Sequence, residues 1–309
     1  MLHTMCSACR ASRTSLKQHK MRTFDTATRS DWIIDHAMRA IISVALALPY
    51  KQRVRWFGAM MERGVAPLAG YRKRAEDQLK FIWPDMDVSD RRNLSKRVCN
   101  NFGRTMIENY SGADFTAQID SATISGDGIA ALEEAKAKGR PVLFVTGHFG
   151  NHEAPRQALT SRGYKIGGLY RRMANPYFNA HYETNMLEMS GDVFAQGRKG
   201  TVGFMRMLKA GGMGTLLFDV RASSFPHISF MGQPAHTATS VADIALKIDA
   251  LVIPYFGIRQ PDGFSFDVTI EAPVCLTNAS QMMTEITARL EARIKANPEQ
   301  WFWVHRRWG

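Results

Sequence analysis

The chain has 309 residues, of which 45% are hydrophobic and 22% are charged, a composition typical of a globular protein with a sizeable core. Its net charge of +12 favours an anionic partner, but charge alone does not distinguish phospholipid from nucleic acid, protein or substrate. Four cysteines are too few for a disulfide framework. Cys6 and Cys9 are interpreted as an incidental pair, because no second Cys-x-x-Cys completes a zinc ribbon.

Residues 1–30 have neither an apolar signal-peptide core nor helical periodicity, so we expect a disordered extension there. In residues 31–50 the unbroken apolar part runs only from Ala40 to Pro49, which is short of the roughly 20 residues that a membrane span requires. This segment is interpreted either as a core helix or as a helix lying in the membrane interface. In the second case, the basic KQRVRW that follows would meet lipid phosphates.

Apolar residues at helical spacing predict a helical N-terminal part over residues 31–120, with helices around 54–82 and 89–110. From residue 121 to residue 309, short apolar runs alternate with helical patterns. This alternation predicts an α/β fold, with a mostly parallel central sheet flanked by helices. We expect 31–309 to be a single domain, because no linker or repeat is visible.

Expected strands lie at residues 141–147, 165–170, 215–220 and 250–259. Residues 264–274 alternate in polarity, which predicts an antiparallel strand at the edge of the sheet. Further helices are expected before a stop at Gly139, from Ser240, and after a cap at Asn278 or Ser280.

The stretch GHFGNHE, residues 147–153, follows an apolar strand pattern directly. Sites in open α/β sheets form beyond the carboxyl ends of strands, and glycines let the chain turn sharply there. We expect His148 to act as a general base and Glu153 to orient its ring, because a carboxylate on one ring nitrogen leaves the other free to take a proton. Histidines that only cap or pack at the strand end are the alternative.

Other chemistry has less support. His148 and His152 have the i,i+4 spacing of two metal ligands, but Gly150 lies between them and there is no His-Glu-x-x-His order, so no metal is expected. Gly-x-Ser-x-Gly and Gly-x-x-x-x-Gly-Lys motifs are absent, and no cofactor is predicted. No interleaving of aromatic and basic residues suggests base stacking, so no nucleic-acid partner is expected.

Four segments resemble the bacterial lipid A biosynthesis acyltransferases, the lauroyl/myristoyl transferase family among the glycerolipid-type acyltransferases. His148 and Glu153 are similar to that family's His-x-x-x-x-Asp/Glu motif. The other three segments are YRRMANP at 170–176, FMGQP with the helix and strand that follow it at 230–259, and NPEQWFWVHRRW at 297–308. The apolar N-terminal segment is shorter here than in the family.

The resemblance implies transfer of a fatty acyl chain from acyl carrier protein to a hydroxyl of a lipid A precursor, with His148 and Glu153 as catalytic residues. Backbone amides of the 147–151 turn, Asn151 or Arg171 would stabilise the oxyanion. Arg198 and Lys199 would hold a precursor phosphate. The residues expected to bind substrate are Gly147, Asn151, Arg171, Arg172, Arg198, Lys199 and Asp219.

The expected partners are acyl carrier protein, the lipid A precursor and an anionic membrane surface, all of which would attract a basic protein. We expect attachment to the cytoplasmic face of the inner membrane, peripheral or shallowly anchored by residues 31–50. Three alternatives stay open: a related acyltransferase acting on a lysophospholipid, another glycolipid or an ornithine lipid; a non-catalytic basic membrane- or nucleic-acid-binding protein; and a metal-dependent hydrolase.

Overall fold

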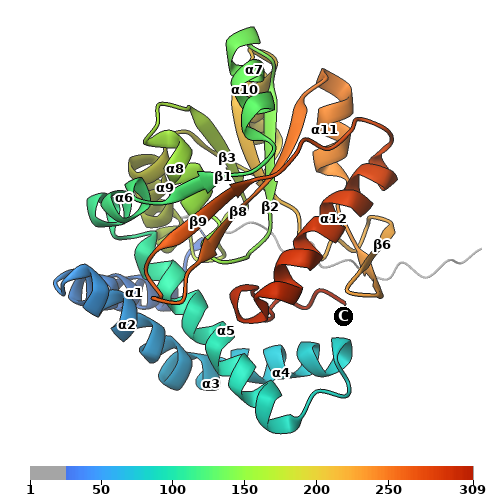
Figure 1. Ribbon diagram of the computed structural model, residues 1–309. Helices are drawn as coiled ribbons and strands as arrows, with labels where there is room; N and C mark the ends of the chain where they lie inside the picture. The colour runs from blue at the N-terminus through green and yellow to red at the C-terminus, as the bar shows by residue number, and fades with distance from the viewer. Residues whose placement is uncertain (1–25, 309) are drawn as a thin grey trace, which may run out of the picture.

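The computed structural model describes residues 26–308 (Figure 1). Cys6, Cys9 and most of the expected N-terminal extension lie outside these residues. Helix α1 (Arg29–Leu46) begins before residue 31, inside the stretch expected to be disordered. A capping box starts it: the Thr28 hydroxyl accepts from the amide of Asp31, and the Asp31 carboxylate accepts from the amide of Thr28.

The helical N-terminal part is confirmed, with one division that the periodicity did not show. The expected helix over residues 54–82 is split at Gly70, whose φ of 69° is a left-handed conformation that suits glycine. The elements of this part are α2 (Tyr50–Met60), the π-helical turn η2 (Met61–Val65), α3 (Ala66–Leu68), α4 (Tyr71–Ile82), α5 (Val88–Glu108) and α6 (Gly112–Asp120).

A mostly parallel sheet of seven strands follows, as the alternating pattern predicted, in the order β1-β9-β8-β2-β5-β3-β4. Strand β9 runs antiparallel to β8 as expected, but it is not at the edge, because β1 pairs with it. A hairpin of β6 and β7 stands apart from this sheet. The strands are β1 (Thr123–Ser125), β2 (Val142–Thr146), β3 (Ile166–Tyr170), β4 (Val193–Ala195), β5 (Met213–Leu217), β6 (His227–Phe230), β7 (Gln233–His236), β8 (Leu251–Arg259) and β9 (Phe266–Ile270).

Helices cover both faces of the sheet (Figure 1). Successive side chains of a strand point to opposite faces, so Val142 and Phe144 of β2 pack among α6 to α9, whereas Leu143 and Val145 pack among α10 to α12. Because both faces are buried, β2 is apolar throughout rather than alternating. These helices are α7 (Ile129–Lys138), α8 (Ala154–Thr160), α9 (Pro176–Ser190), α10 (Arg198–Lys209), α11 (Ser240–Ile248) and α12 (Ala279–Ala296), the last capped by Asn278 as expected.

The helical N-terminal part lies at one end of the strands, with α4 and α5 below the sheet in Figure 1. The parallel strands β2, β3, β4, β5 and β8 all end at a common edge. Helix α5 packs there against the short 3-10 helix η3 (Pro298–Gln300), and the side chain of Asn101 donates to the carbonyl of Gln300 at 3.5 Å. The carboxyl ends of the strands therefore face the helical part, and this is where a site is expected.

Candidate active site

The carboxyl end of β2 carries the corner formed by residues 147–153. Strands β2 and β5 are parallel neighbours with Thr146 opposite Leu217, so the residues after each strand meet. His148 Nδ1 lies 2.8 Å from Asp219 Oδ1, and the backbone N–H of His148 donates to Asp219 Oδ2 at 2.8 Å. The two strand ends thus hold a histidine and a carboxylate in a two-point contact.

This pair has the electrostatics of an oriented base. Asp219 is fully buried, whereas 27% of the His148 side chain is exposed. Burial favours a raised pKa, but the charge of the His148 ring and the hydrogen bonds from it outweigh burial and hold the pKa of Asp219 well below its usual range. An ionised Asp219 accepts the proton on Nδ1, which leaves Nε2 able to take a proton. Within the described residues, no hydrogen bond engages Nε2.

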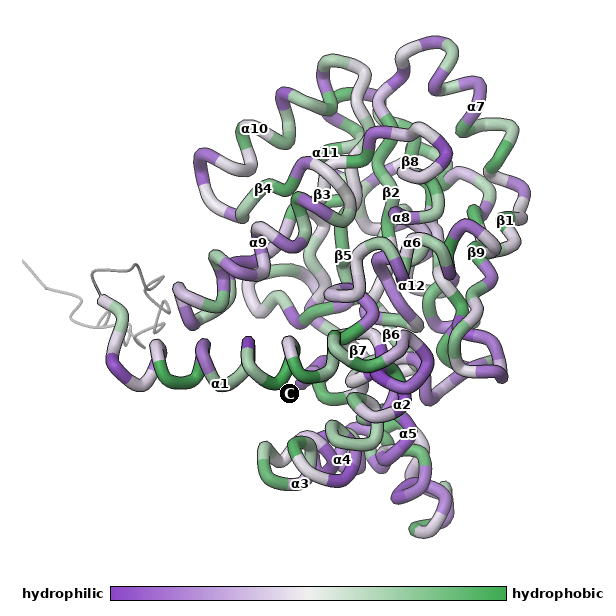
Figure 2. The backbone as a smooth tube through the Cα atoms, turned by 90° about the vertical axis from the view of Figure 1, so that its left-hand side faces the viewer, coloured by the Kyte–Doolittle hydropathy of each residue, from purple (hydrophilic) through white to green (hydrophobic). Residues whose placement is uncertain are grey.

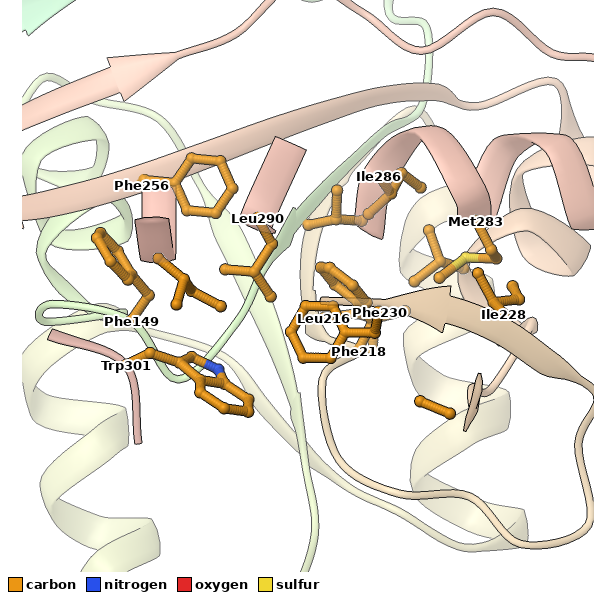
Figure 3. Close-up of a cluster of buried hydrophobic side chains, with 14 of the residues drawn as sticks. Phe149, Leu216, Phe218, Ile228, Phe230, Phe256, Met283, Ile286, Leu290 and Trp301 are labelled. Carbon is orange, nitrogen blue, oxygen red and sulfur yellow. The ribbon is translucent and has the colours of Figure 1, made fainter. Parts of the chain in front are cut away.

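Asp219 has a further donor from the other end of the sequence. The indole Nε1 of Trp301 donates to Asp219 Oδ2 at 2.8 Å, and the amide of Phe302 donates to the carbonyl of His148 at 2.9 Å. Phe149 and Trp301 form an isolated antiparallel bridge, and Figure 3 shows both at one end of the buried apolar cluster. The segment at 297–308 therefore forms one wall of the site.

Two more histidines border His148. The ring centroids of His152 and His305 lie 5.4 Å and 4.6 Å from that of His148. Burial, followed by the nearby charge of His148, lowers the pKa of His152 to about 3 and that of His305 to about 4. Both are therefore neutral at pH 7, and they surround His148 without adding charge to it.

Glu153 does not occupy the position expected for it. Its carboxylate lies 3.5 Å from Arg156 Nη1 and 4.0 Å from His152 Nε2, while Asp219 makes the contact to His148. Burial raises the pKa of Glu153, and the charge of Arg156 opposes this rise. Arg156 is itself buried and donates to the backbone carbonyls of Ile166 and Asp192, so this pair fastens the corner to β3 and the start of β4.

Asn151 is part of a second buried network. Its Nδ2 donates to Glu108 Oε2 at 3.0 Å, and its Oδ1 accepts from the amide of Glu153 at 3.0 Å. Glu108 also forms a buried ion pair with Arg259, at the end of β8. Asn151 thus ties the corner to α5, and both ends of its side chain are engaged.

The backbone amides of this turn are also engaged, so the expectation that they stabilise an oxyanion is wrong for residues 148–151. An amide that already donates inside the protein is not available to a substrate. Their acceptors, in chain order, are Asp219 Oδ2 and the carbonyls of Gly147, Gln300 and Gly257. The amide of His152, the next residue, has no acceptor within the described residues.

Both glycines of the corner are required by close packing. A Cβ on Gly147 would lie 2.8 Å from Leu290 and 3.0 Å from the carboxylate of Asp219. Gly150 has a φ of 56°, and a Cβ there would lie 1.9 Å from the carbonyl oxygen of Gly257. Gly147 therefore brings the backbone close to Asp219, and Gly150 lets the turn lie against β8.

The four basic residues expected to bind substrate lie at the same edge of the sheet as His148. Arg171 and Arg172 follow β3, and Arg198 and Lys199 begin α10 after β4. All four are exposed, and the structure describes no hydrogen bond or ion pair for any of their side chains in residues 26–308. They form a basic rim two and three strands away from β2, without touching His148.

Sequence reasoning missed several residues of the site. Buried ion pairs are formed by Arg156, Glu108 and Arg259. In the sequence, the only sign of them was a charged residue inside an otherwise apolar or helical pattern. Arg307, left without a role, is buried, donates to the carbonyl of His236 at 2.6 Å and lies 5.2 Å from the ring of Phe230.

Among residues 26–308, no group of three or more His, Cys, Asp and Glu side chains is placed to hold a metal ion.

Comparison with known proteins identifies the family. The family model described as "Bacterial lipid A biosynthesis acyltransferase" matches residues 21–309. The chain belongs to this family. The activity of the family is acyl transfer in lipid A biosynthesis, which confirms the resemblance seen in the four sequence segments.

Curated relatives agree with this family at low identity. The chain is 24% identical over 236 residues to the lipid A biosynthesis lauroyltransferase of Escherichia coli, covering 74% of this chain and 76% of the relative. It is 19% identical over 258 residues to lipid A biosynthesis acyltransferase 2 of Shigella flexneri, covering 81% and 79%. A lipid A biosynthesis acyltransferase of Haemophilus influenzae is 22% identical over 236 residues, covering 75% and 74%.

Proposed function

We propose that this acyltransferase moves a fatty acyl chain from the thioester of an acyl carrier protein to a hydroxyl of a lipid A precursor, with His148 as the general base. The observation that supports it is the contact between His148 Nδ1 and the buried Asp219, which orients the ring and leaves Nε2 to accept a proton. Membership of an acyltransferase family supplies the reaction class.

In this mechanism the acceptor hydroxyl attacks the thioester carbonyl while Nε2 of His148 removes its proton. The C–O bond forms, the C–S bond breaks, and the proton passes from His148 to the leaving thiolate. Asp219 accepts from Nδ1 throughout and balances the charge of the protonated ring. Base catalysis of this kind contributes roughly 10²–10⁴-fold to the rate. Glu153 acts as a positioning residue, because its carboxylate contacts Arg156 and His152 rather than His148.

The developing oxyanion requires a donor beyond the four engaged amides of the corner. We assign this role to the unengaged amide of His152, which belongs to the same turn. Arg171, Arg172, Arg198 and Lys199 form an exposed basic rim at this edge of the sheet, where they are placed to contact phosphate groups of the substrates. Gly147 and Asn151 shape the corner, through the packing of Gly147 against Asp219 and the hydrogen bonds of Asn151 with Glu108 and Glu153.

Attachment to an anionic membrane fits the surface of α1. Ile33 is 59% exposed and Val44 is 61% exposed, and Trp32, Ile34 and Ile41 are exposed on the same helix. Figure 2 shows α1 at the border of the molecule beside α9, with apolar and polar residues mixed along it. No helix within residues 26–308 is long and apolar enough to cross a bilayer. We propose shallow insertion of α1 at the cytoplasmic face of the inner membrane.

The test is acyl transfer from acyl carrier protein to a tetra-acylated lipid A precursor, read by mass spectrometry. Wild type is expected to add one acyl mass, and His148→Ala is expected to lose at least about a hundredfold in rate. His227→Ala, an exposed histidine of the β6–β7 hairpin, is the matched control and should keep the wild-type rate. Full activity in His148→Ala would overturn the base assignment, and transfer only to a lysophospholipid or an ornithine lipid would overturn the acceptor.

A further inference from the structure

A second cleft opens at the same edge of the sheet, beside the His148 corner. It has a volume of about 710 Å³, within the range of ligand pockets. Its walls come from α5 with the π-helical turn η2, from the turn after β8, and from the link between α12 and η3. Asn101 and Gln300 line both this cleft and the small pocket that contains His148 and His152, so the two adjoin.

The floor of the cleft is rigid. The amide of Arg259 donates to Gln300 Oε1 at 2.9 Å, and Gln300 Nε2 donates to the carbonyl of Arg259 at 2.8 Å. Arg259 Nε also donates to Asn101 Oδ1 at 2.7 Å. Polar groups held in this way give a preformed floor, because these three side chains are already fixed before a ligand binds.

The lining of the cleft carries both signs of charge and several amides. Arg97 and Arg104 oppose the carboxylates of Glu62 and Glu299, and the charge of Arg259 is balanced by Glu108 outside the cleft. A phosphate pocket would show an excess of basic groups, because each carboxylate repels the anion. A lining with balanced charge fits a neutral ligand with many hydroxyl and amide groups.

Unengaged donors and acceptors face such a ligand. The side chains of Arg97 and Glu299 make no hydrogen bond or ion pair with other residues that the structure describes, and Gln260 uses only its Nε2. Guanidinium, carboxylate and amide groups are planar and present paired donors or acceptors, which match neighbouring hydroxyls of a sugar ring. Their unused capacity distinguishes them from Asn100, whose amide already bonds to Glu62 and Arg104.

We propose that this cleft binds the carbohydrate headgroup of the acceptor glycolipid, an inference that rests on the proposed acyl transfer to a lipid A precursor. The reacting hydroxyl and the sugar belong to one molecule, so the sugar site must adjoin the base. The cleft meets this requirement through the wall shared at Asn101 and Gln300. The sugar then fixes which hydroxyl of the acceptor reaches His148.

A comparison of kinetic constants tests this assignment with the full chain. The double variant Arg97→Ala/Glu299→Ala is expected to raise KM for the glycolipid acceptor about tenfold or more, through the loss of hydrogen bonds to the sugar. The KM for acyl carrier protein should stay within about twofold of wild type. Arg92→Ala, an exposed arginine of α5 outside the cleft, is the matched control and should leave both constants unchanged. A rise only in the KM for acyl carrier protein would assign the cleft to binding of the acyl donor. No change in either KM would overturn the proposal.

A binding experiment separates this proposal from the catalytic one. An N-acylglucosamine disaccharide without fatty chains is titrated into the His148→Ala protein and followed by saturation-transfer NMR. Binding is expected, and Arg97→Ala/Glu299→Ala in the same background should abolish it. This result does not depend on acyl transfer, so it would stand even if another residue were the base. Binding of 4′-phosphopantetheine or inorganic phosphate in place of the disaccharide would overturn the carbohydrate assignment.

Discussion

At the scale of single residues, the site depends on a contact between side chains 71 positions apart in the sequence, His148 and Asp219. The aspartate receives three hydrogen bonds, from the ring and amide of His148 and from the indole of Trp301. An anion that is fully buried needs such donors, because an unpaired buried charge is costly. The charge of His148 and its two hydrogen bonds keep Asp219 ionised, and the contact with Asp219 holds the ring of His148 in one orientation.

Replacing Asp219 by asparagine tests this arrangement. Asp219→Asn retains the shape but loses the charge and presents an NH₂ group to donors, so kcat should fall roughly 10²–10⁴-fold with little change in KM. Steady-state rates with both substrates give the answer. Trp301→Phe removes one donor without changing the charge and should lose less activity. Wild-type kcat in Asp219→Asn would show that Asp219 has no part in catalysis.

The low pKa of His152 predicts how the stability of the protein depends on pH. Its pKa is about 3 in the folded protein and near 6.5 when unfolded, so the unfolded chain binds more protons as pH falls below about 6.5. Stability is therefore lost toward acid, by up to about 1.4 kcal/mol per pH unit for one histidine. Urea unfolding at pH 7, 6 and 5 should show a shallower loss in His152→Gln than in wild type. An unchanged slope would contradict the low pKa.

At the scale of elements, the corner after β2 is shaped by its contact with β8. The amide of Asn151 donates to the carbonyl of Gly257 at 3.3 Å, and Gly150 lies so close to the same carbonyl that no side chain fits. The positive φ of Gly150 is a second reason for glycine. Either feature alone would disfavour another residue there, and the two act together.

A pair of alanine variants separates these two causes. Gly139, which ends α7, has a φ of 62°, close to the 56° of Gly150, but a Cβ there meets nothing within 4 Å. Gly139→Ala is expected to cost about 1 kcal/mol for the backbone conformation alone. Gly150→Ala should cost about 1–3 kcal/mol more because of the clash. Chemical denaturation measures both, and equal losses would remove the packing argument.

The sequence predicted the elements that are long or strongly patterned. β2, β3, β5, β8 and α12 were found because buried strands are apolar runs and amphipathic helices keep one apolar face. β1 and β4, of three residues each, were missed because so short a strand shows no alternation. The hairpin of β6 and β7 was missed for the same reason, with four residues in each strand.

The site was predicted in part, and the missing part is non-local. The position of His148 after β2 follows from local pattern, and so did the choice of Glu153, its nearest carboxylate in sequence. Strand order decides which carboxylate reaches the ring, and nothing in one sequence shows that β5 lies beside β2. Asp219 was therefore only one strand-end candidate among several, although it makes the contact.

At the scale of the whole molecule, the proposed membrane attachment would use both the net charge of +12 and the exposed apolar side chains of α1. In the proposed attachment, basic residues would attract the protein to an anionic bilayer, and side chains such as Ile33 and Val44 would then leave water. The charge was evident from composition, whereas the exposure of α1 depends on packing. A core helix and an interfacial helix have the same sequence pattern, and only the neighbouring elements in the fold distinguish them.

Vesicle binding tests this use of the surface. Ile33→Glu/Val44→Glu should lower partitioning onto vesicles containing anionic phospholipid by tenfold or more, since burial of one such side chain contributes about 1.5–3 kcal/mol. Leu246→Glu changes an exposed leucine of α11 and is the matched control. Binding of wild type should weaken as salt is raised. If both proteins partition equally, α1 does not contact the bilayer.

The segment at 297–308 is synthesised long after the residues that it contacts, so we expect the site to be completed late in synthesis. The amide of Arg307 bonds to Gln78, 229 residues earlier, and Trp301 supplies a donor to Asp219. At roughly 5–20 residues per second, a ribosome adds Trp301 about 8–30 s after His148. Through this interval the nascent chain carries His148, the proposed base, without the segment that forms one wall of the site. A ribosome-bound chain stalled before residue 301 should therefore be folded in part and catalytically silent.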